Sequence, residues 1–261
     1  MDPLLSNVGW LVALLLVIVG SLASVGATVL VRRGVAGIGE GHNAVLGTLL
    51  GTGSMFCGIV IALAVFVVWN HLTVVRQAEG DQGGSLIVLY RDAEVLPEPG
   101  RTRVEAAIRD YTASMVEDEF PALARGRPSN RTERSLSRLN AVVHQYLGGT
   151  SAPDEVSGVA RSQYQLVQAS ATGMPPLMWG FMVGVCVLLL LMAAPLFMEN
   201  SRVQWLGSIL LGCSLGAALF LIIVADHPYT GPLRVTPDDL TANLHTYAVI
   251  DANAPLDQPS S

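Results

Sequence analysis

The chain alternates between long apolar runs and polar stretches. Four runs are long enough to cross the roughly 30 Å of hydrocarbon in a bilayer as α-helices, and they lie at residues 11–31, 45–69, 177–197 and 203–225. The first run could instead be a signal peptide, but residues 1–9 contain Asp2 and no basic residue, whereas a signal peptide needs a positively charged start. The pattern therefore predicts four retained membrane spans, grouped as hairpins within residues 1–70 and 174–225.

Residues 71–173, between spans two and three, are polar but carry apolar residues at helical spacing. Asn130 and Glu133 resemble a capping box that opens one of these helices, and the helix before it is expected to end near Pro121. The apolar stripes hold Leu86, Leu89, Tyr90 and Ala93, then Val104, Ile108, Tyr111 and Met115, then Leu136, Leu139, Val143 and Tyr146, and finally Val156, Val159, Leu166 and Val167. We expect a helical extramembrane domain whose stripes form its core, followed by a C-terminal tail, residues 226–261, with a short helix that has Thr236 as its N-cap and Pro237 as its first residue.

Small residues recur four positions apart in every predicted span. The pairs are Gly20 and Ser24, Gly47 and Gly51, Gly180 and Gly184, and Gly212 and Gly216. Such pairs let helix backbones approach closely in lipid. They predict a tightly packed bundle, formed within one subunit or between subunits.

Composition agrees with a membrane protein and excludes several functions. The chain is 51% hydrophobic and 14% charged, and its net charge of −6 argues against nucleic acid as a partner. Cys57, Cys186 and Cys213 all lie in apolar runs, which argues against a disulfide framework or a zinc site. The five histidines are dispersed, and the glycine-rich GIGEG at 37–41 follows a span instead of the strand that a phosphate loop requires. No catalytic residue, metal or cofactor is therefore predicted, and the chain is not expected to be an enzyme.

The end of span four, VADHPYTGPLRV, gathers several residues with special chemistry: Asp226, His227, Pro228, Tyr229 and Gly231. The simplest interpretation is a helix stop at the membrane surface, because proline ends a helix, glycine permits a turn and tyrosine prefers the interface. Asp226 would then bond an arginine of the polar insert. The alternative is that the acid and the histidine belong to an ion path, since ionisable groups near hydrocarbon are often functional.

Several segments together resemble one known family, the bacterial bestrophin-like domain proteins. They are SLIVLYRDAEVLPEPGRTRVEAAIRDYTASMVEDEFPAL, PPLMWGFMVGVCVLLLLMAAPLF, VADHPYTGPLRVTPDDL and HNAVLG. The resemblance implies the plan of bestrophins, pentameric anion channels with four spans and a helical domain between spans two and three. The glycine-rich stretch 78–84 departs from the family pattern, as do Asn70 and His71. It is therefore open whether span two continues outward as one rigid helix.

On this basis the fold class is an all-α membrane protein with four transmembrane helices and an inserted helical domain. The first functional hypothesis is a homo-oligomeric channel for small anions, pentameric by analogy, in which span two lines the pore. That span is uncharged, so its gate would be a hydrophobic constriction; the candidates at helical spacing are Phe56, Ile59, Leu63 and Phe66. These side chains would equally suit contact with lipid or with neighbouring helices. The second hypothesis is a non-conducting scaffold or sensor whose insert binds a partner, in an envelope-stress or phage-exclusion role.

The expected location is the bacterial plasma membrane, with the insert and both termini on one side. The short loops hold Arg32, Arg33 and Arg202, and the positive-inside rule then places these loops in the cytoplasm and the insert outside. The likeness to bestrophins implies the reverse orientation. We follow the charge rule.

Overall fold

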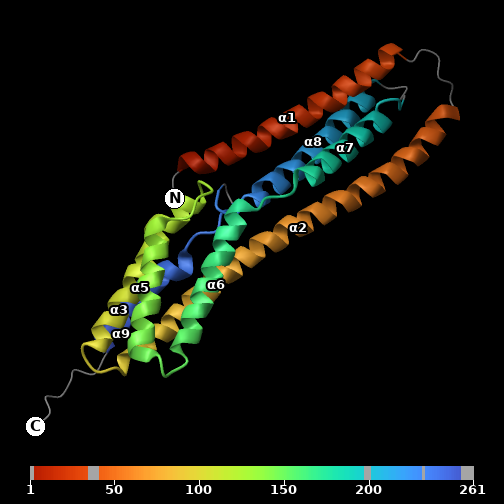
Figure 1. Ribbon diagram of the computed structural model, residues 1–261. Coiled ribbons are helices and arrows are strands. Elements are labelled where there is room, and N and C mark those ends of the chain that lie inside the picture. Colours follow the sequence, from red (N-terminus) through yellow and green to blue (C-terminus); the bar gives the residue numbers. More distant parts are fainter. Residues whose placement is uncertain (1–2, 35–40, 197–200, 231–232, 254–261) are drawn as a thin grey trace, which may run out of the picture. The chain divides into compact units, whose positions relative to one another are not determined.

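The structure is a computed structural model that describes residues 3–34, 41–196, 201–230 and 233–253. Regular structure in these ranges is entirely helical (Figure 1). The elements are α1 (Pro3–Gly34), α2 (Gly41–Glu94), α3 (Gly100–Ser114), the π-helix η1 (Met115–Glu119), α4 (Phe120–Leu123), α5 (Asn130–Leu147), α6 (Ala152–Ala171), α7 (Pro176–Ala193), α8 (Ser201–Asp226) and α9 (Asp238–Asn253).

Four helices are long and apolar enough to cross a membrane, as the hydropathy pattern predicts. Their candidate segments are Leu11–Val31, Ala44–Glu94, Pro176–Ala193 and Arg202–Asp226. The prediction for the third run, residues 177–197, is too long, because α7 ends at Ala193 and residue 197 lies outside the described residues. Pro195 explains the end of this helix, since a proline has no backbone N–H to continue the helical hydrogen bonds.

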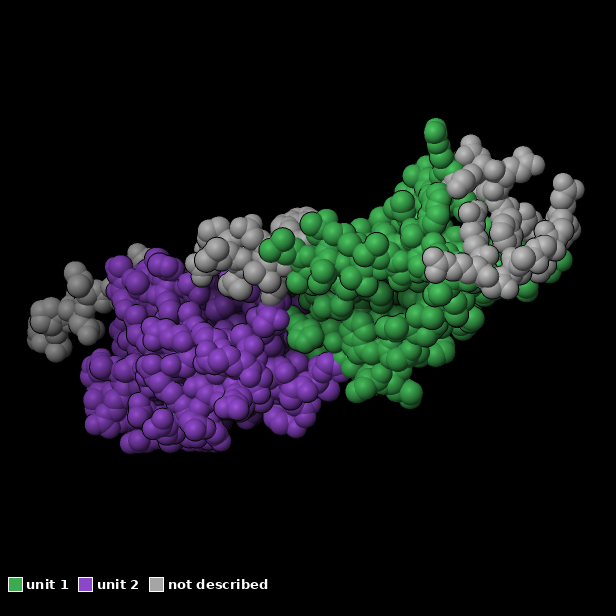
Figure 2. Space-filling model, turned by 90° about the horizontal axis from the view of Figure 1, so that it is seen from above, with its two compact units in different colours: residues 1–71, 174–227, 231–233 green, residues 72–173, 228–230, 234–261 purple. Residues whose placement is uncertain are grey.

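The chain divides into two compact units (Figure 2). One, which we call the apolar unit, contains described residues within 1–71 and 174–227 together with Leu233. The other, the helical unit, contains 72–173, 228–230 and the described residues from 234 onward. Helix α2 contributes residues to both units.

Within the apolar unit, α1 and α8 pack with their backbones nearly touching. A Cβ atom added at Gly212 would lie 2.4 Å from the carbonyl oxygen of Gly20, and one at Gly216 would lie 2.6 Å from that of Leu16. Small-residue packing is thus confirmed for α1 and α8. A Cβ atom at any glycine of the pairs 47/51 and 180/184 would meet no described atom within 4 Å, so these pairs make no close helix contact among the described residues.

Helix α2 runs without a break through its glycine-rich stretch, which answers the question left open by the sequence. The glycines there make room for α9, because a Cβ atom at Gly83 would lie 3.3 Å from the Cβ atom of Asp239. The side-chain amide of Asn243 also donates a hydrogen bond of 2.8 Å to the carbonyl oxygen of Gly83. Packing against α9 therefore offsets the low helix propensity of glycine.

The apolar stripes of the helical unit form its core, as predicted; Leu86, Tyr90, Ile108, Leu139 and Leu166 are all fully buried.

The helix that starts at Gly100 passes through Pro121 and ends two residues later at Leu123, near the predicted end. The π-helical turn before this proline explains the continuity, because it widens the helix where the proline ring would meet the carbonyl of Glu117, four residues earlier. Helix α5 is capped by Ser129 and not by Asn130: the Ser129 hydroxyl accepts a hydrogen bond of 3.2 Å from the backbone N–H of Arg131.

Candidate functional site: one face of α2 and the end of α8

The apolar half of α2 has two opposite faces. Cys57, Ala64 and Val68 are buried against α7 and α8. Successive residues of a helix are rotated by about 100°, so Ile59 and Phe66 lie opposite this buried line. They are 50% and 68% exposed.

The exposed line changes character along the helix. Thr48 and Thr52 share it in the first half, where their hydroxyls donate hydrogen bonds of 3.1 Å to the backbone carbonyls four residues earlier. Ile59 and Phe66 occupy it in the second half. No Asp, Glu, Lys or Arg occurs between residues 41 and 75. The face is therefore weakly polar at one end and purely apolar at the other.

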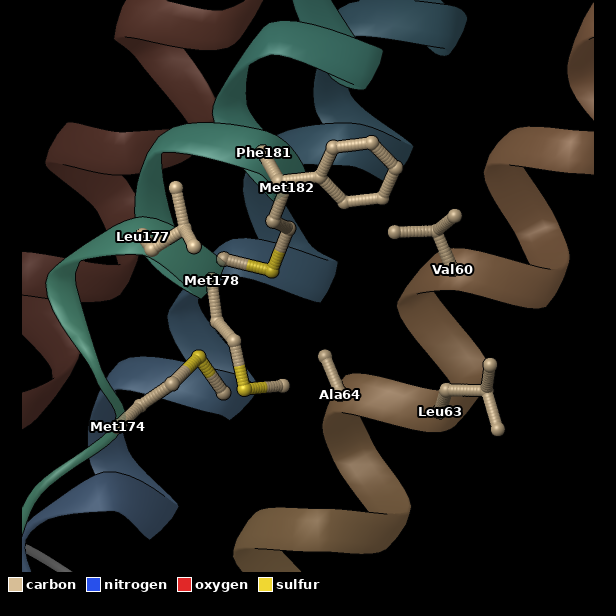
Figure 3. Close-up of a pocket in the computed structure, with 8 residues that line it drawn as sticks. All are labelled: Val60, Leu63, Ala64, Met174, Leu177, Met178, Phe181 and Met182. Carbon is tan, nitrogen blue, oxygen red and sulfur yellow. The ribbon is translucent and has the colours of Figure 1, made fainter.

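Phe56 and Leu63, the other two pore candidates, are exposed but point to a different side of α2. The Phe56 ring lies edge-on to that of Phe181 in α7, with ring centroids 6.5 Å apart. Leu63 lines an apolar cavity of about 400 Å³ between α2 and α7, whose remaining lining residues are Val60, Ala64, Met174, Leu177, Met178, Phe181 and Met182 (Figure 3). The four candidates thus fall on two lines, and only Ile59 and Phe66 face directly away from the protomer.

At the end of α8, Asp226 is buried and binds the chain just before α7. One carboxylate oxygen accepts a hydrogen bond of 2.7 Å from the backbone N–H of Met174. The partner of Asp226 is therefore a backbone N–H, and not the arginine of the insert that the sequence suggested. This bond joins the start of span three to the end of span four.

The other residues of this stretch have separate environments. His227 is exposed, and a nitrogen of its ring lies 3.3 Å from the carbonyl oxygen of Ile223. Pro228 accepts a hydrogen bond of 2.7 Å from the backbone N–H of Val235, which closes the turn. The Tyr229 hydroxyl donates to the carbonyl oxygen of Leu166 at 2.6 Å. Gly231 lies outside the described residues, as does most of the GIGEG segment. The structure does not bring these side chains together into one site.

Two buried carboxylates of the helical unit had no place in the sequence analysis. Glu79, 5% exposed, accepts hydrogen bonds from the backbone N–H groups of Asp239 at 3.0 Å and Leu240 at 3.3 Å, and so caps the start of α9. Burial raises the pKa of Glu79 to about 7, and the nearby Asp239 carboxylate adds to the shift. No local sequence pattern announces this contact, because its partners are backbone groups about 160 residues away.

Glu119 is fully buried at the end of the π-helix. One of its oxygens accepts a hydrogen bond of 2.8 Å from the backbone N–H of Ser129, and the other has no partner among the described residues. Burial raises the pKa of Glu119. The available signal was the position of Glu119 near the end of the first segment that carries the family resemblance.

A tyrosine pair fixes the far end of α9. The rings of Tyr90 and Tyr247 stack with centroids 4.3 Å apart, and both are fully buried. The Tyr90 hydroxyl donates to Asp251 at 2.6 Å and accepts from Arg109, which also pairs with Asp251. These contacts hold α9 on α2 and α3. Within the described ranges, no group of three His, Cys, Asp or Glu side chains is arranged to hold a metal ion.

The fold and the long apolar helices define an all-helical membrane protein. The profile of the bestrophin-like domain family matches residues 18–240, and the chain belongs to this family. Three crystal structures illustrate the shared fold. One, of a membrane protein, has a TM-score of 0.67 at 12% identity and covers 93% of this chain and 99% of its own. Two mutant forms of a bacterial bestrophin homologue from Klebsiella pneumoniae have TM-scores of 0.65 and 0.66 at 12% and 14% identity, covering 91% and 92% of this chain and 99% and 98% of theirs. Among curated proteins, none matches significantly.

Proposed function

We propose that this protein is a homo-oligomeric channel for small anions in the bacterial plasma membrane. The observation that carries the proposal is the exposed line of α2, which is free of charge and ends in Ile59 and Phe66. A single protomer does not enclose this line. Several copies arranged around an axis would turn it into the wall of a pore, and likeness to bestrophins suggests five.

The constriction of such a pore would lie at Ile59 and Phe66. The threonines of the same line would keep the first half of the pore wetted, whereas two rings of large apolar side chains exclude water when the pore is narrow. Ion flow would then depend on widening at these rings. The preference for anions is taken from the family and not from any charge on α2.

Phe56 and Leu63 have a different role in this proposal. Because Phe56 contacts Phe181 of α7 and Leu63 borders the cavity beside α7, we assign both to contacts between helices instead of the ion path. The motif at the end of α8 is likewise structural: Asp226 holds the start of α7, and neither Asp226 nor His227 lines the pore.

The test is halide flux into liposomes that contain the purified protein. We expect flux above that of empty vesicles, and we expect Ile59→Ala/Phe66→Ala to increase it severalfold by widening the constriction. A matched control is Leu14→Ala/Leu22→Ala in α1, which removes two comparably exposed side chains from another helix.

Two results would overturn the proposal. One is a protein that remains monomeric in mild detergent, because one protomer encloses no path. The other is an oligomer without flux in both the parent and the double variant, which would favour the non-conducting scaffold.

The proposed topology has the short loops in the cytoplasm, and the insert and both termini outside. Arg202, at the start of α8, supports it through the positive-inside rule. Labelling of a cysteine placed at exposed Ser137 of α5 by a membrane-impermeant maleimide in whole cells would test it. If the cysteine is labelled only after the cells are lysed, the insert lies in the cytoplasm and the proposed orientation is wrong.

A further inference from the structure

Arginine is concentrated in one exposed part of the helical unit. Five of the 15 basic residues of the chain lie within residues 125–138, although the whole protein carries a net charge of −6. They are Arg125, Arg127, Arg131, Arg134 and Arg138, and all five are exposed. The last three follow at one-turn spacing along α5, so they share one face of the helix.

This face borders a concavity of about 290 Å³, which we call the arginine pocket. It is lined by Asp110, Arg131, Arg134, Ser135 and Arg138. Three arginines therefore line one small space, together with a single carboxylate. Such a space has room for more than a single halide ion.

The two outer arginines are held in place by acids. Arg131 pairs with Asp118 at 2.8 Å and lies 3.7 Å from Glu117, while Arg138 pairs with Asp110 at 3.0 Å. Each of these pairs uses one terminal nitrogen of the guanidinium, Nη1. Because a guanidinium has five N–H donors, both arginines keep further donors for a ligand.

Arg134 lies between them and has no carboxylate partner among the described residues. Its Nε donates a hydrogen bond of 3.0 Å to the carbonyl oxygen of Asn130, one turn earlier, which orients the group and leaves its terminal nitrogens available. The lining of the arginine pocket thus includes an oriented arginine without an ion pair among the described residues.

The segment before α5, residues 125–127, forms an ordered turn and carries two further arginines. Gly126 has a φ of +70°, a conformation that favours glycine. The N–H of Gly126 donates to Leu123, and that of Arg127 donates to Ala122, at 2.9 and 3.1 Å, the pattern of a Schellman motif. Within the described ranges, Arg125 and Arg127 have no ion pair.

We propose that the arginine pocket binds a phosphate group. Guanidinium groups suit phosphate because their planar forks of donors match its oxygens, and charge-assisted hydrogen bonds of this kind are stronger than neutral ones. The partly positive N-terminus of α5 adds to the attraction. The group could belong to a lipid headgroup or to a soluble phosphate compound, and both present the same oxygens to the pocket. This inference is independent of ion conduction.

The experiment uses the detergent-solubilised full chain, with binding measured by calorimetry. The probes are inorganic phosphate and short-chain phosphatidylglycerol, with chloride as the reference anion. We expect Arg134→Gln to weaken phosphate binding about tenfold, because it removes a hydrogen bond to a charged group. Arg134 is exposed, so the substitution should not disturb the fold. The matched control, Arg91→Gln/Arg161→Gln, removes two exposed arginines outside the pocket and should bind like the parent.

Each outcome decides the inference. Stronger binding of phosphatidylglycerol than of inorganic phosphate, lost in Arg134→Gln, would support the pocket and identify a lipid headgroup. Binding of inorganic phosphate alone, lost in the same variant, would support a soluble ligand. Unchanged phosphate binding in Arg134→Gln, equal weakening by the control, equal binding of chloride, or no phosphate binding by the parent would overturn the proposal.

Discussion

Gly212→Ala tests the closest contact in the apolar unit. The added methyl group would lie 2.4 Å from the carbonyl oxygen of Gly20 and 2.6 Å from the Cα atom of Ser21. Both atoms belong to the backbone of α1, so no side chain can move aside. Ordinary van der Waals contact is reached only if α1 and α8 separate by about 1 Å, a distance over which dispersion contacts weaken sharply.

The expected cost follows from overpacking and from the polar contacts beside the crossing. Overpacking of a close contact costs about 1–3 kcal/mol. Separation would also stretch the contact of 3.2 Å between Ser21 Oγ and Cys213 Sγ. We therefore expect Gly212→Ala to lower the free energy of unfolding by about 2 kcal/mol, and the melting temperature by several degrees.

The assay is thermal unfolding in detergent, with Gly207→Ala as the matched control. Gly207 lies on the same helix, and a Cβ atom there would meet no described atom within 4 Å. Alanine has the better helix propensity, so the control should be neutral or slightly stabilising. If Gly212→Ala unfolds at the same temperature as Gly207→Ala, the close packing of α1 and α8 is wrong.

Two further predictions concern buried carboxylates. Asp226→Ala should leave the N–H of Met174 without a buried partner, at a cost of about 1–3 kcal/mol. We expect a reduced yield of oligomer on size-exclusion chromatography with unchanged flux per oligomer, and a milder effect from His227→Ala. A normal yield with altered flux would instead place Asp226 in the ion path. Because the pKa of Glu79 is raised to about 7, the folded state binds its proton more tightly than the unfolded state, and this contribution to stability is complete below about pH 4.5 and lost as the pH rises through 7. Glu79→Gln keeps an acceptor for the N–H of Asp239 and should flatten the pH dependence of the melting temperature between pH 4.5 and 7; an unchanged dependence would contradict the assignment.

The helices of this protein could be predicted because each follows from a local rule. Lipid forces every backbone group of a span into internal hydrogen bonds, so an uncharged run such as residues 11–31 is sufficient evidence for a long helix. In the helical unit, a stripe such as Ile108 and Tyr111 must be covered, and the buried core follows from that need. The family resemblance rested on the order of such segments.

The candidate site could be predicted only in outline. Helical spacing alone grouped Phe56, Ile59, Leu63 and Phe66 as pore-lining candidates. When the neighbours of a helix are unknown, any of these residues could face away from the protomer. Once α7 and α8 cover Cys57 and Ala64, the four separate into an outward line and a line beside α7. Which side of α2 is outward is a property of the packed protomer.

Contacts between acidic side chains and backbone groups could not be predicted from the sequence. Asp226 bonds the N–H of Met174, and Glu79 bonds the N–H groups at the start of α9. A backbone N–H is the same in nearly every residue, so no residue type announces it as the partner of a distant acid. A tertiary contact also explains why α2 continues through its glycines. Helix α9 packs against this stretch, whereas nothing in the local sequence favours a helix there. The sequence by itself determined the four long apolar helices, the core stripes and the family, whereas the tertiary structure decided which acids are buried, which glycines are in contact and which residues of α2 face outward.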